Sequence, residues 1–127
     1  MAQVKGIGGV FFKAKDPAKL RAWYQEYLGI IPETEGHVAF WWKQVDNPED
    51  QMTVWSPFPQ DTAYFEPTNA PFMINYIVDD LDGLLADLRA KGVSVDDKIE
   101  EYDYGRFGWA TDPEGNRFEL WQPSKTP

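Results

Sequence analysis

Glu119 is the carboxylate of this sequence that is best placed to take part in chemistry. Apolar and other residues alternate on both sides of a turn at 112–116, which predicts a β-hairpin over 105–121. Because alternate residues of a strand share a face, Arg117, Glu119 and Trp121 should lie together. A carboxylate among aromatic side chains could anchor a polar group of a ligand or act as a general base. The alternative is an edge strand whose charged face meets water.

The turn itself is predicted from its residue types, Asp-Pro-Glu-Gly-Asn. Pro113 presets φ, Asp112 can accept hydrogen bonds from the amides that follow it, and Gly115 accepts a positive φ. The hairpin that carries Glu119 is therefore expected to be well defined.

Other catalytic chemistries find little support in the sequence. It has no cysteine, which removes thiolate nucleophiles, disulfides and cysteine-based zinc sites. Its one histidine, His37, follows Gly36, and we interpret it as an exposed turn residue. A Ser-His-Asp arrangement would need His37 with Ser56, Ser94 or Ser124, and one chain cannot supply two imidazoles to a metal.

The composition narrows the classes of partner. The chain has 127 residues, a size typical of one domain, and 21 acidic against 12 basic residues give a formal net charge of -9. This charge argues against a nucleic acid or an anionic membrane surface as partner. With no apolar run that could span a membrane and no secretory pattern, we expect a cytoplasmic protein. Aromatic residues make up 16% of the chain, so some of the aromatic side chains are expected to line a cavity or an interface.

The first half of the chain should position part of such a cavity. A strand over 6–14 ends at Asp16 and Pro17, which suit the N-cap and first position of a helix. An apolar stripe then follows at helical spacing, and Gly29 stands where a helix should end. We expect this stripe to pack on a sheet in the core. It consists of Leu20, Trp23, Tyr24, Tyr27 and Leu28.

A second hairpin and an irregular segment come next. Strands over 38–43 and 52–56 flank an acidic turn, so the first half reads strand, helix, strand, strand. Residues 57–71 contain four prolines and three aromatic residues, and we interpret them as a segment that crosses to the second half. Such a segment could be a plain linker, but its aromatic residues favour a flap over a pocket or a loop that contacts a partner.

The second half repeats the first. A strand over 72–78 precedes Asp80, an apolar stripe of leucines follows at helical spacing, and Gly92 should end that helix. The capping residues Asp16 and Asp80 are 64 residues apart, about half the chain, which indicates a duplication. A strand over 98–102 and the hairpin of Glu119 complete the second unit.

With these motifs in place, the chain resembles the vicinal oxygen chelate superfamily, which includes glyoxalase I, bleomycin resistance proteins and extradiol dioxygenases. The resemblance covers nearly all 127 residues and depends on three stretches, at 16–29, 78–93 and 111–120. It implies an α+β fold in which two tandem βαβββ modules form a partly open mixed-sheet barrel. We expect one domain over 1–127, with module one at about 5–56, the crossing segment at 57–71 and module two at about 72–123. Short members of the family are commonly homodimers, and we expect a homodimer here.

The resemblance also implies where a metal would be bound, and the sequence departs from it there. In metal-dependent members the ligands come from the first strand of each module, a later strand of the first and the last strand of the second. The matching positions here are Gly9 and Met73, a residue at or near Trp55, and Glu119. One carboxylate beside a thioether does not suit a hard divalent cation. We therefore expect no metal ion and no other cofactor.

The alternation of the strands and the turns between them gives a candidate ligand-binding set, in which Trp55 and Trp109 stack on the ligand, Asn75 and Glu119 anchor it, and Arg106 or Lys13 lies near the mouth. The alternative is that these side chains fill a collapsed core. The candidate residues are Phe11, Lys13, Trp41, Trp55, Met73, Asn75, Tyr104, Arg106, Trp109, Arg117, Glu119 and Trp121.

Three hypotheses about function follow. The first is metal-independent binding of an aromatic or planar small molecule, similar to sequestration by bleomycin resistance proteins. The second is an enzyme of the same superfamily, a lyase, isomerase or dioxygenase, that uses Glu119 as metal ligand or general base. The third is a dimeric interaction module without a ligand.

Overall fold

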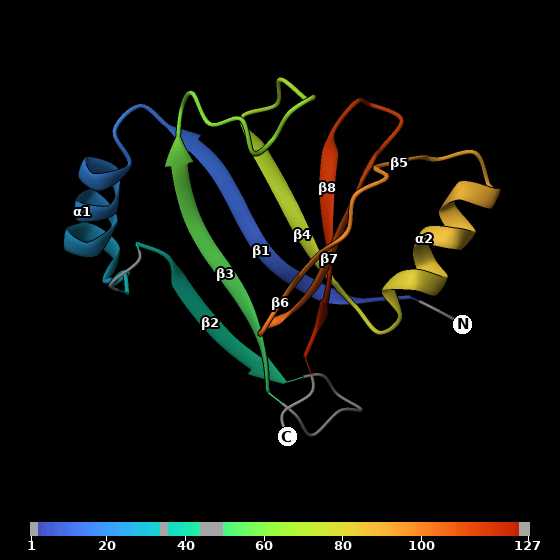
Figure 1. Ribbon diagram of the computed structural model, residues 1–127. Helices are drawn as coiled ribbons and strands as arrows, with labels where there is room; N and C mark the ends of the chain where they lie inside the picture. Colours follow the sequence, from blue (N-terminus) through green and yellow to red (C-terminus); the bar gives the residue numbers. More distant parts are fainter. Residues whose placement is uncertain (1–2, 34–35, 44–49, 125–127) are drawn as a thin grey trace.

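A computed structural model describes residues 3–33, 36–43 and 50–124. These residues form two helices and eight strands, whose arrangement is drawn in Figure 1. In chain order these are β1 (Val4–Ala14), α1 (Pro17–Leu28), β2 (Val38–Lys43), β3 (Asp50–Pro59), β4 (Phe72–Val78), α2 (Leu81–Ala90), β5 (Ser94–Val95), β6 (Glu100–Tyr102), β7 (Gly105–Thr111) and β8 (Arg117–Pro123).

All eight strands belong to one mixed sheet that does not close on itself. Its order is β2-β3-β1-β4-β8-β7-β5, and β6 pairs with the first three residues of β7. The first strand of each module is parallel to the last strand of that module, β1 to β3 and β4 to β8. In Figure 1 the helices lie on opposite sides of the curved sheet, α1 beside β3 and α2 beside β7. The predicted α+β fold with a partly open mixed sheet is confirmed.

The two modules differ in their number of strands. Module two supplies β4, β5, β6, β7 and β8, whereas module one supplies β1, β2 and β3 among the residues that the structure describes. The sequence pattern placed the start of the crossing segment at residue 57, but β3 continues to Pro59. The two-residue strand β5 was not predicted.

The central seam of the sheet is the antiparallel pair β1–β4. Gly9 lies opposite Asn75, Val10 opposite Ile74 and Phe11 opposite Met73. Between Ile7 and Gly9 the register shifts by one residue, so that Gly8 forms a bulge in β1. The bulge aims both Gly8 and Gly9 toward Asn75, and the two modules therefore meet closely at this point.

The predicted helix starts and hairpin turn are confirmed. The side chain of Asp16 accepts a hydrogen bond from the Lys19 amide at 3.1 Å, and the side chain of Asp80 accepts one from the Gly83 amide at 3.1 Å. In the β7–β8 turn, Asp112 Oδ1 accepts from the amides of Glu114 and Asn116, each at 2.9 Å. The hairpin that carries Glu119 is thus fixed at its turn.

Packing of α1 differs from the prediction. No residue of α1 is buried, and Trp23, Tyr27 and Leu28 are 50%, 62% and 62% exposed. Only one edge of the stripe meets the sheet, where the Tyr24 ring lies 5.0 Å from the ring of Trp55. The prediction that the whole stripe packs in the core is wrong, because the large side chains on this face of the sheet leave no close seat for the helix.

The buried core lies mainly in module two. One cluster, on the outer face, joins Leu81 and Leu85 of α2 to Val78 and Leu120. The other, on the inner face, consists of Phe65, Met73, Ile77, Phe107, Trp109 and Trp121. Within the part of the chain that the structure describes, neither helix has the length and apolar content needed to cross a membrane.

Candidate functional site

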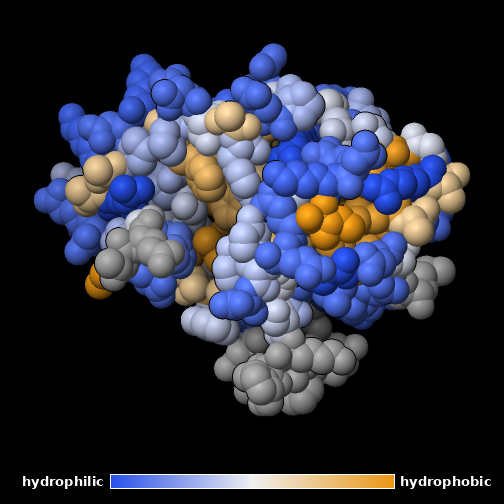
Figure 2. Space-filling view, in the orientation of Figure 1, coloured by the Kyte–Doolittle hydropathy of each residue, from blue (hydrophilic) through white to orange (hydrophobic). Residues whose placement is uncertain are grey.

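A cavity of about 510 Å³ lies between the inner faces of strands from both modules. This volume falls within the range that small-molecule sites occupy, roughly 300–1,000 Å³. In Figure 2 apolar surface shows in the hollow between the α1 side and the central strands. Strands β1, β3, β4, β7 and β8 supply most of the wall. The lining residues are Gly8, Phe11, His37, Met52, Val54, Ser56, Phe58, Tyr64, Asn75, Tyr104, Phe107, Glu119 and Trp121.

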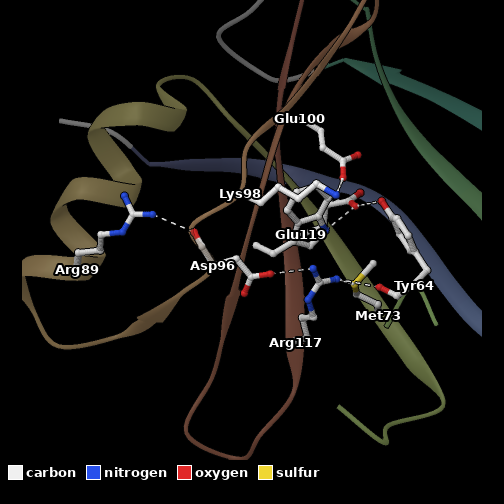
Figure 3. Close-up of polar contacts among 9 residues, drawn as sticks. Tyr64, Met73, Arg89, Asp96, Lys98, Glu100, Arg117 and Glu119 are labelled. Atoms are coloured by element: carbon white, nitrogen blue, oxygen red, sulfur yellow. Dashed lines mark hydrogen bonds and ion pairs between the residues drawn. The ribbon is translucent and has the colours of Figure 1, made fainter. Parts of the chain in front are cut away.

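Glu119 is the central polar group of this wall. It is 1% exposed, and three uncharged groups donate hydrogen bonds to it. Asn75 Nδ2 donates to Oε1, while Tyr64 Oη and Trp109 Nε1, the latter at 2.9 Å, both donate to Oε2. Figure 3 shows Glu119 and Tyr64 pointing toward one another. The donors come from three segments, namely β4, the crossing segment and β7, so the carboxylate is held in one orientation.

Burial controls the protonation of this cluster. Loss of hydration raises the pKa of Glu119 above its usual range, and the three donated hydrogen bonds and the charge of Arg117 oppose this effect only in part. Burial and the neighbouring carboxylate likewise raise the pKa of Tyr64, so that its hydroxyl keeps its proton and remains a donor. The site combines a carboxylate that is hard to ionise with a phenol that is harder still.

Asn75 presents an unused acceptor beside Glu119. Its side chain is 1% exposed and gives its amide hydrogen to Glu119, while Oδ1 has no hydrogen-bond partner among the described residues. Oδ1 lies next to Gly8 at the cavity wall, and a Cβ at Gly8 would approach Ile77 and Trp121 to 2.8 and 2.9 Å. A buried acceptor without a partner is costly, and a ligand with a donor could satisfy it.

Arg117 supports the site from behind. Its guanidinium lies 5.0 Å from the centre of the Trp109 ring, and Nη2 is 2.9 Å from Asp96 Oδ2. Nη1 donates to the Tyr64 carbonyl at 2.9 Å, and Figure 3 shows the side chain between Asp96 and Tyr64. The residue therefore ties the crossing segment to module two. It is not among the residues that line the cavity.

The structure brings together many of the residues predicted from the sequence. Five of them line the cavity, namely Phe11, Asn75, Tyr104, Glu119 and Trp121. Met73, Trp109 and Arg117 lie directly behind that wall, where Met73 and Trp109 belong to the buried inner cluster. Their placement follows the predicted alternation of β4, β7 and β8.

The remaining predicted residues lie elsewhere. Trp55 faces α1 and the ring of Phe12, so its expected stacking role is wrong: the cavity face of β3 is Met52, Val54, Ser56 and Phe58. Arg106 lies on the helix-covered face of β7, where it is bound to Asp82 and Glu101, each through bonds of 2.9–3.0 Å.

Trp41 and Lys13 also lie away from the cavity wall. Trp41 is 62% exposed on β2. The ammonium of Lys13 lies 5.7 Å from the centre of the Phe65 ring, behind the crossing segment. The mouth of the cavity therefore carries neither of the two cations that the sequence pattern had placed there.

Several lining residues were missed by the sequence reading. His37, interpreted as an exposed turn residue, lines the cavity and lies 3.2 Å from Glu33 Oε2. Tyr64 belongs to the crossing segment, whose aromatic content did indicate a flap; its ring stacks on Phe58 at 5.6 Å. Met52, Val54 and Ser56 were missed because either set of alternate residues on β3 contains large apolar side chains, so alternation alone does not show which set faces inward.

The donor set at this wall does not suit a divalent metal. Asn75 pairs with Glu119 across β4 and β8, and the equivalent pair in module one is Phe11 with Ser56, so Ser56, next to Trp55, is the counterpart of Glu119. Gly9, Ser56 and Met73 offer no charged ligand, and both Glu119 oxygens already accept hydrogen bonds. No group of three His, Cys, Asp or Glu residues gathers within the described ranges.

The sequence was compared with models of known protein families. The sequence matches the Glyoxalase/Bleomycin resistance protein/Dioxygenase superfamily over residues 6–120. The chain belongs to this superfamily. No curated protein sequence matches the chain, so the superfamily assignment comes from the family match and agrees with the fold.

Solved structures of the glyoxalase superfamily share the fold. A variant of methylmalonyl-CoA epimerase from Streptomyces coelicolor, in complex with 2-nitronate-propionyl-CoA, is 17% identical with a TM-score of 0.66, and the match covers 97% of this chain and 100% of that chain. The Mycobacterium tuberculosis methylmalonyl-CoA epimerase is 18% identical, TM-score 0.60, over 96% and 90%. A superfamily member from Vibrio splendidus 12B01 is 14% identical, TM-score 0.57, over 96% and 99%. At these identities the likeness concerns the fold alone.

Proposed function

We propose that this glyoxalase-superfamily protein binds an aromatic or planar small molecule in the cavity and does so without a metal ion. The observation that carries the proposal is the pair of polar side chains in the wall, Glu119 and Asn75. Each is 1% exposed, and the Asn75 oxygen lacks a partner within the described chain. Buried polar groups at an otherwise apolar wall are the usual means by which a small-molecule site orients its ligand.

The rings around these groups support the choice of a flat ligand. Phe107 and Trp121 are stacked with their centres 5.8 Å apart and planes at 5°, and Phe58 and Tyr64 are stacked at 5.6 Å and 16°. Aromatic walls favour another ring because offset stacking adds to the burial of apolar area.

A fragment screen followed by a cavity-filling variant tests this proposal. We expect some planar aromatic fragments to raise the melting temperature by mass action and to shift the indole N–H resonance of Trp121. The resonances of the exposed Trp23 and Trp41 should not move. Val54→Trp places a ring in the cavity from β3 and should abolish binding of the hits. Fragments that bind the folded Val54→Trp protein as well as they bind the wild type would contradict the proposal.

Metal independence has its own test. Protein purified without a chelator should contain no stoichiometric zinc, nickel, manganese or iron, because Glu119 is the single carboxylate at the wall among the residues that the structure describes. About one metal per chain in elemental analysis would contradict this part and favour a metal-dependent lyase, isomerase or dioxygenase.

A metal-free enzyme is the second candidate, and the raised pKa of Glu119 favours it. A buried carboxylate with such a pKa is suited to accept a proton from carbon near neutral pH. The test is incubation of carbonyl compounds with the protein in D₂O. Deuterium incorporation next to the carbonyl that is lost in Glu119→Gln would support an isomerase-type activity, and absence of incorporation would leave binding alone.

We also propose that the protein is a homodimer. The α1 surface exposes Trp23, Tyr27 and Leu28, and Ile31 just after the helix is 68% exposed. Apolar side chains gathered in this way are typical of an interface between subunits. Light scattering at micromolar concentration should give twice the chain mass of 14.6 kDa. A monomer mass would contradict the proposal. A dimer that binds no fragment would instead favour an interaction module without a ligand.

A further inference from the structure

The cavity wall has an unbalanced charge. Among the described residues, its lining includes one carboxylate, Glu119, and neither lysine nor arginine. The imidazole of His37 is the basic group at the wall, and it already has Glu33 Oε2 at 3.2 Å. A carboxylate or phosphate in this cavity would lose its hydration without gaining a cation as partner, which is a costly exchange.

Two cations drawn beside Glu119 in Figure 3, Arg117 and Lys98, are paired with other carboxylates. Arg117 Nη2 is 2.9 Å from Asp96 Oδ2, and Lys98 Nζ is 2.7 Å from Glu100 Oε2. Figure 3 shows both pairs beside Glu119, whose own contacts are with Tyr64, Asn75 and Trp109. All three of these donors are uncharged, so no ion pair within the described residues neutralises Glu119. A positive charge brought by a ligand would pair with Glu119 and lower its raised pKa, so that the carboxylate is ionised in the complex.

The aromatic walls favour the same charge. The stacked pairs Phe58–Tyr64 and Phe107–Trp121 line the same cavity as Glu119. The face of an aromatic ring carries partial negative charge and attracts a cation within about 6 Å, more strongly when water is excluded. The same rings give an anion no compensating interaction.

The free acceptor narrows the kind of cation. Within the described part of the chain, Asn75 Oδ1 lacks a donor and Oε1 of Glu119 accepts from Asn75 alone, which leaves it room for a second donor. A protonated amine has more than one N–H and could donate to both oxygens, whereas a quaternary ammonium has none. The wall therefore offers charge, ring faces and two acceptors at one place.

From these contacts we infer that the cavity selects a protonated amine carried on a flat apolar body and rejects organic anions. This inference depends on the proposed function, because it names the class of ligand for the same cavity. It also separates this chain from the epimerase structures with the same fold, whose bound molecules are acyl-CoA thioesters or an analogue. Those molecules carry phosphates, for which this wall has no partner.

Three probes of one shape test the inference by calorimetry at neutral pH. They are 2-naphthylmethylamine, which is a cation, 2-naphthalenemethanol, which is neutral, and 2-naphthoate, which is an anion. We expect the amine to bind at least about tenfold more tightly than the alcohol, and the alcohol more tightly than the naphthoate. Naphthoate binding as tightly as the amine, or equal affinity for the amine and the alcohol, would overturn the inference on wild-type protein alone.

Two variants with the same change in net charge locate the effect. Glu119→Gln should reduce the affinity for the amine to that for the alcohol, while the affinity for the alcohol changes by less than about threefold. The matched control Glu114→Gln, in the exposed β7–β8 turn, should bind all three probes as the wild type does. If Glu119→Gln weakens the binding of the amine and of the alcohol by the same factor, the Glu119 carboxylate shapes the cavity without selecting charge. The inference then fails.

The cavity-filling variant separates this inference from the proposed function. If all three probes bind the wild type equally and Val54→Trp binds none of them, the cavity is a binding site without charge selection, so the inference is wrong and the proposed function stands. If no probe binds the wild type, or if Val54→Trp binds as well as the wild type, the inference fails together with the proposal that aromatic molecules enter this cavity.

Discussion

The helices of the two modules begin and end alike but pack differently. Each has an aspartate at its N-cap, and a glycine with positive φ follows each, Gly29 after α1 and Gly92 soon after α2. Yet Leu81 and Leu85 of α2 are 0% and 1% exposed, whereas α1 has no buried residue. The signals that start and stop a helix therefore do not determine how deeply it packs.

The surface that receives each helix explains the difference. On β7, α2 meets Gly108, where an added Cβ would lie 3.0 Å from Leu85 Cδ1, so the helix approaches the strand closely. On β3 and β1, α1 meets the rings of Trp55 and Phe12, which lie 5.4 Å apart on the same face. Large rings hold α1 away from the sheet and leave its own aromatic side chains in solvent.

The largest expected effect comes from removing one leucine in each helix. Leu85→Ala should lower the free energy of unfolding by about 2–5 kcal/mol, because it leaves a cavity in a packed cluster. Leu28→Ala, at a side chain that is 62% exposed in the single chain, should cost less than about 0.5 kcal/mol at protein concentrations low enough to keep the proposed dimer dissociated. Urea unfolding monitored by circular dichroism measures both. Similar losses would show that α1 is buried in solution, as an interface between two copies would bury it.

The two modules also differ in the part of the cavity wall that each supplies. Module two has the buried carboxylate Glu119, whereas module one has Ser56 at the equivalent position, so a pH dependence of stability is expected from module two. The raised pKa of Glu119 means that the folded state holds this proton to a higher pH than the unfolded state. Stability should therefore fall as pH rises between the usual and the raised pKa, by up to about 1.4 kcal/mol for each pKa unit of the rise.

Glu119→Gln should remove this fall, and the groups around Glu119 remain the same in the variant. These are Tyr64 from the crossing segment, Arg117 from β8 and the pair Lys98–Glu100 near β6. The stability of wild type relative to variant, from urea unfolding between about pH 5 and pH 8, should decrease as pH rises. A relative stability that stays constant or increases would mean that Glu119 is ionised throughout this range.

The two capping aspartates provide a smaller and more local comparison. Asp80→Ala should lower the free energy of global unfolding by about 0.5–2 kcal/mol, because α2 is part of the core. Asp16→Ala should mainly increase hydrogen exchange of the α1 amides, since α1 can loosen without disturbing the buried clusters. Global unfolding of the Asp16 variant should change by less than that of the Asp80 variant. The reverse order would contradict the view that α1 is loosely attached.

The smallest effect is expected in the β7–β8 turn. Glu114 is exposed, and its backbone amide, not its side chain, contacts Asp112. Glu114→Gln should change the free energy of unfolding by less than about 0.5 kcal/mol. A larger change would mean that the Glu114 carboxylate makes a stabilising contact that the structure does not show.

The helix starts and the Glu119 hairpin could be predicted from the sequence because turn and cap chemistry acts over a few residues. The duplication could be predicted because the same signals recur in the second half of the chain. Inner faces of β4 and β8 were predicted because their two sides differ in polarity. The face of β3 was not predicted, since Trp55 and Val54 are both apolar and only pairing with β1 decides between them. The same holds for His37 and Tyr64, which reach the cavity through contacts distant in sequence.

The pairing of β1 with β4 is symmetric about the residues Val10 and Ile74. Val10 and Ile74 stand at the same distance before the capping aspartates of their modules, and they pair with one another. The pairs on either side, Gly9 with Asn75 and Phe11 with Met73, exchange equivalent positions about this centre. Two identical modules related by a two-fold axis would meet in this way. A gene for one module could thus have encoded a self-pairing protein before duplication and fusion joined the copies, after which each half was free to change its own wall of the cavity.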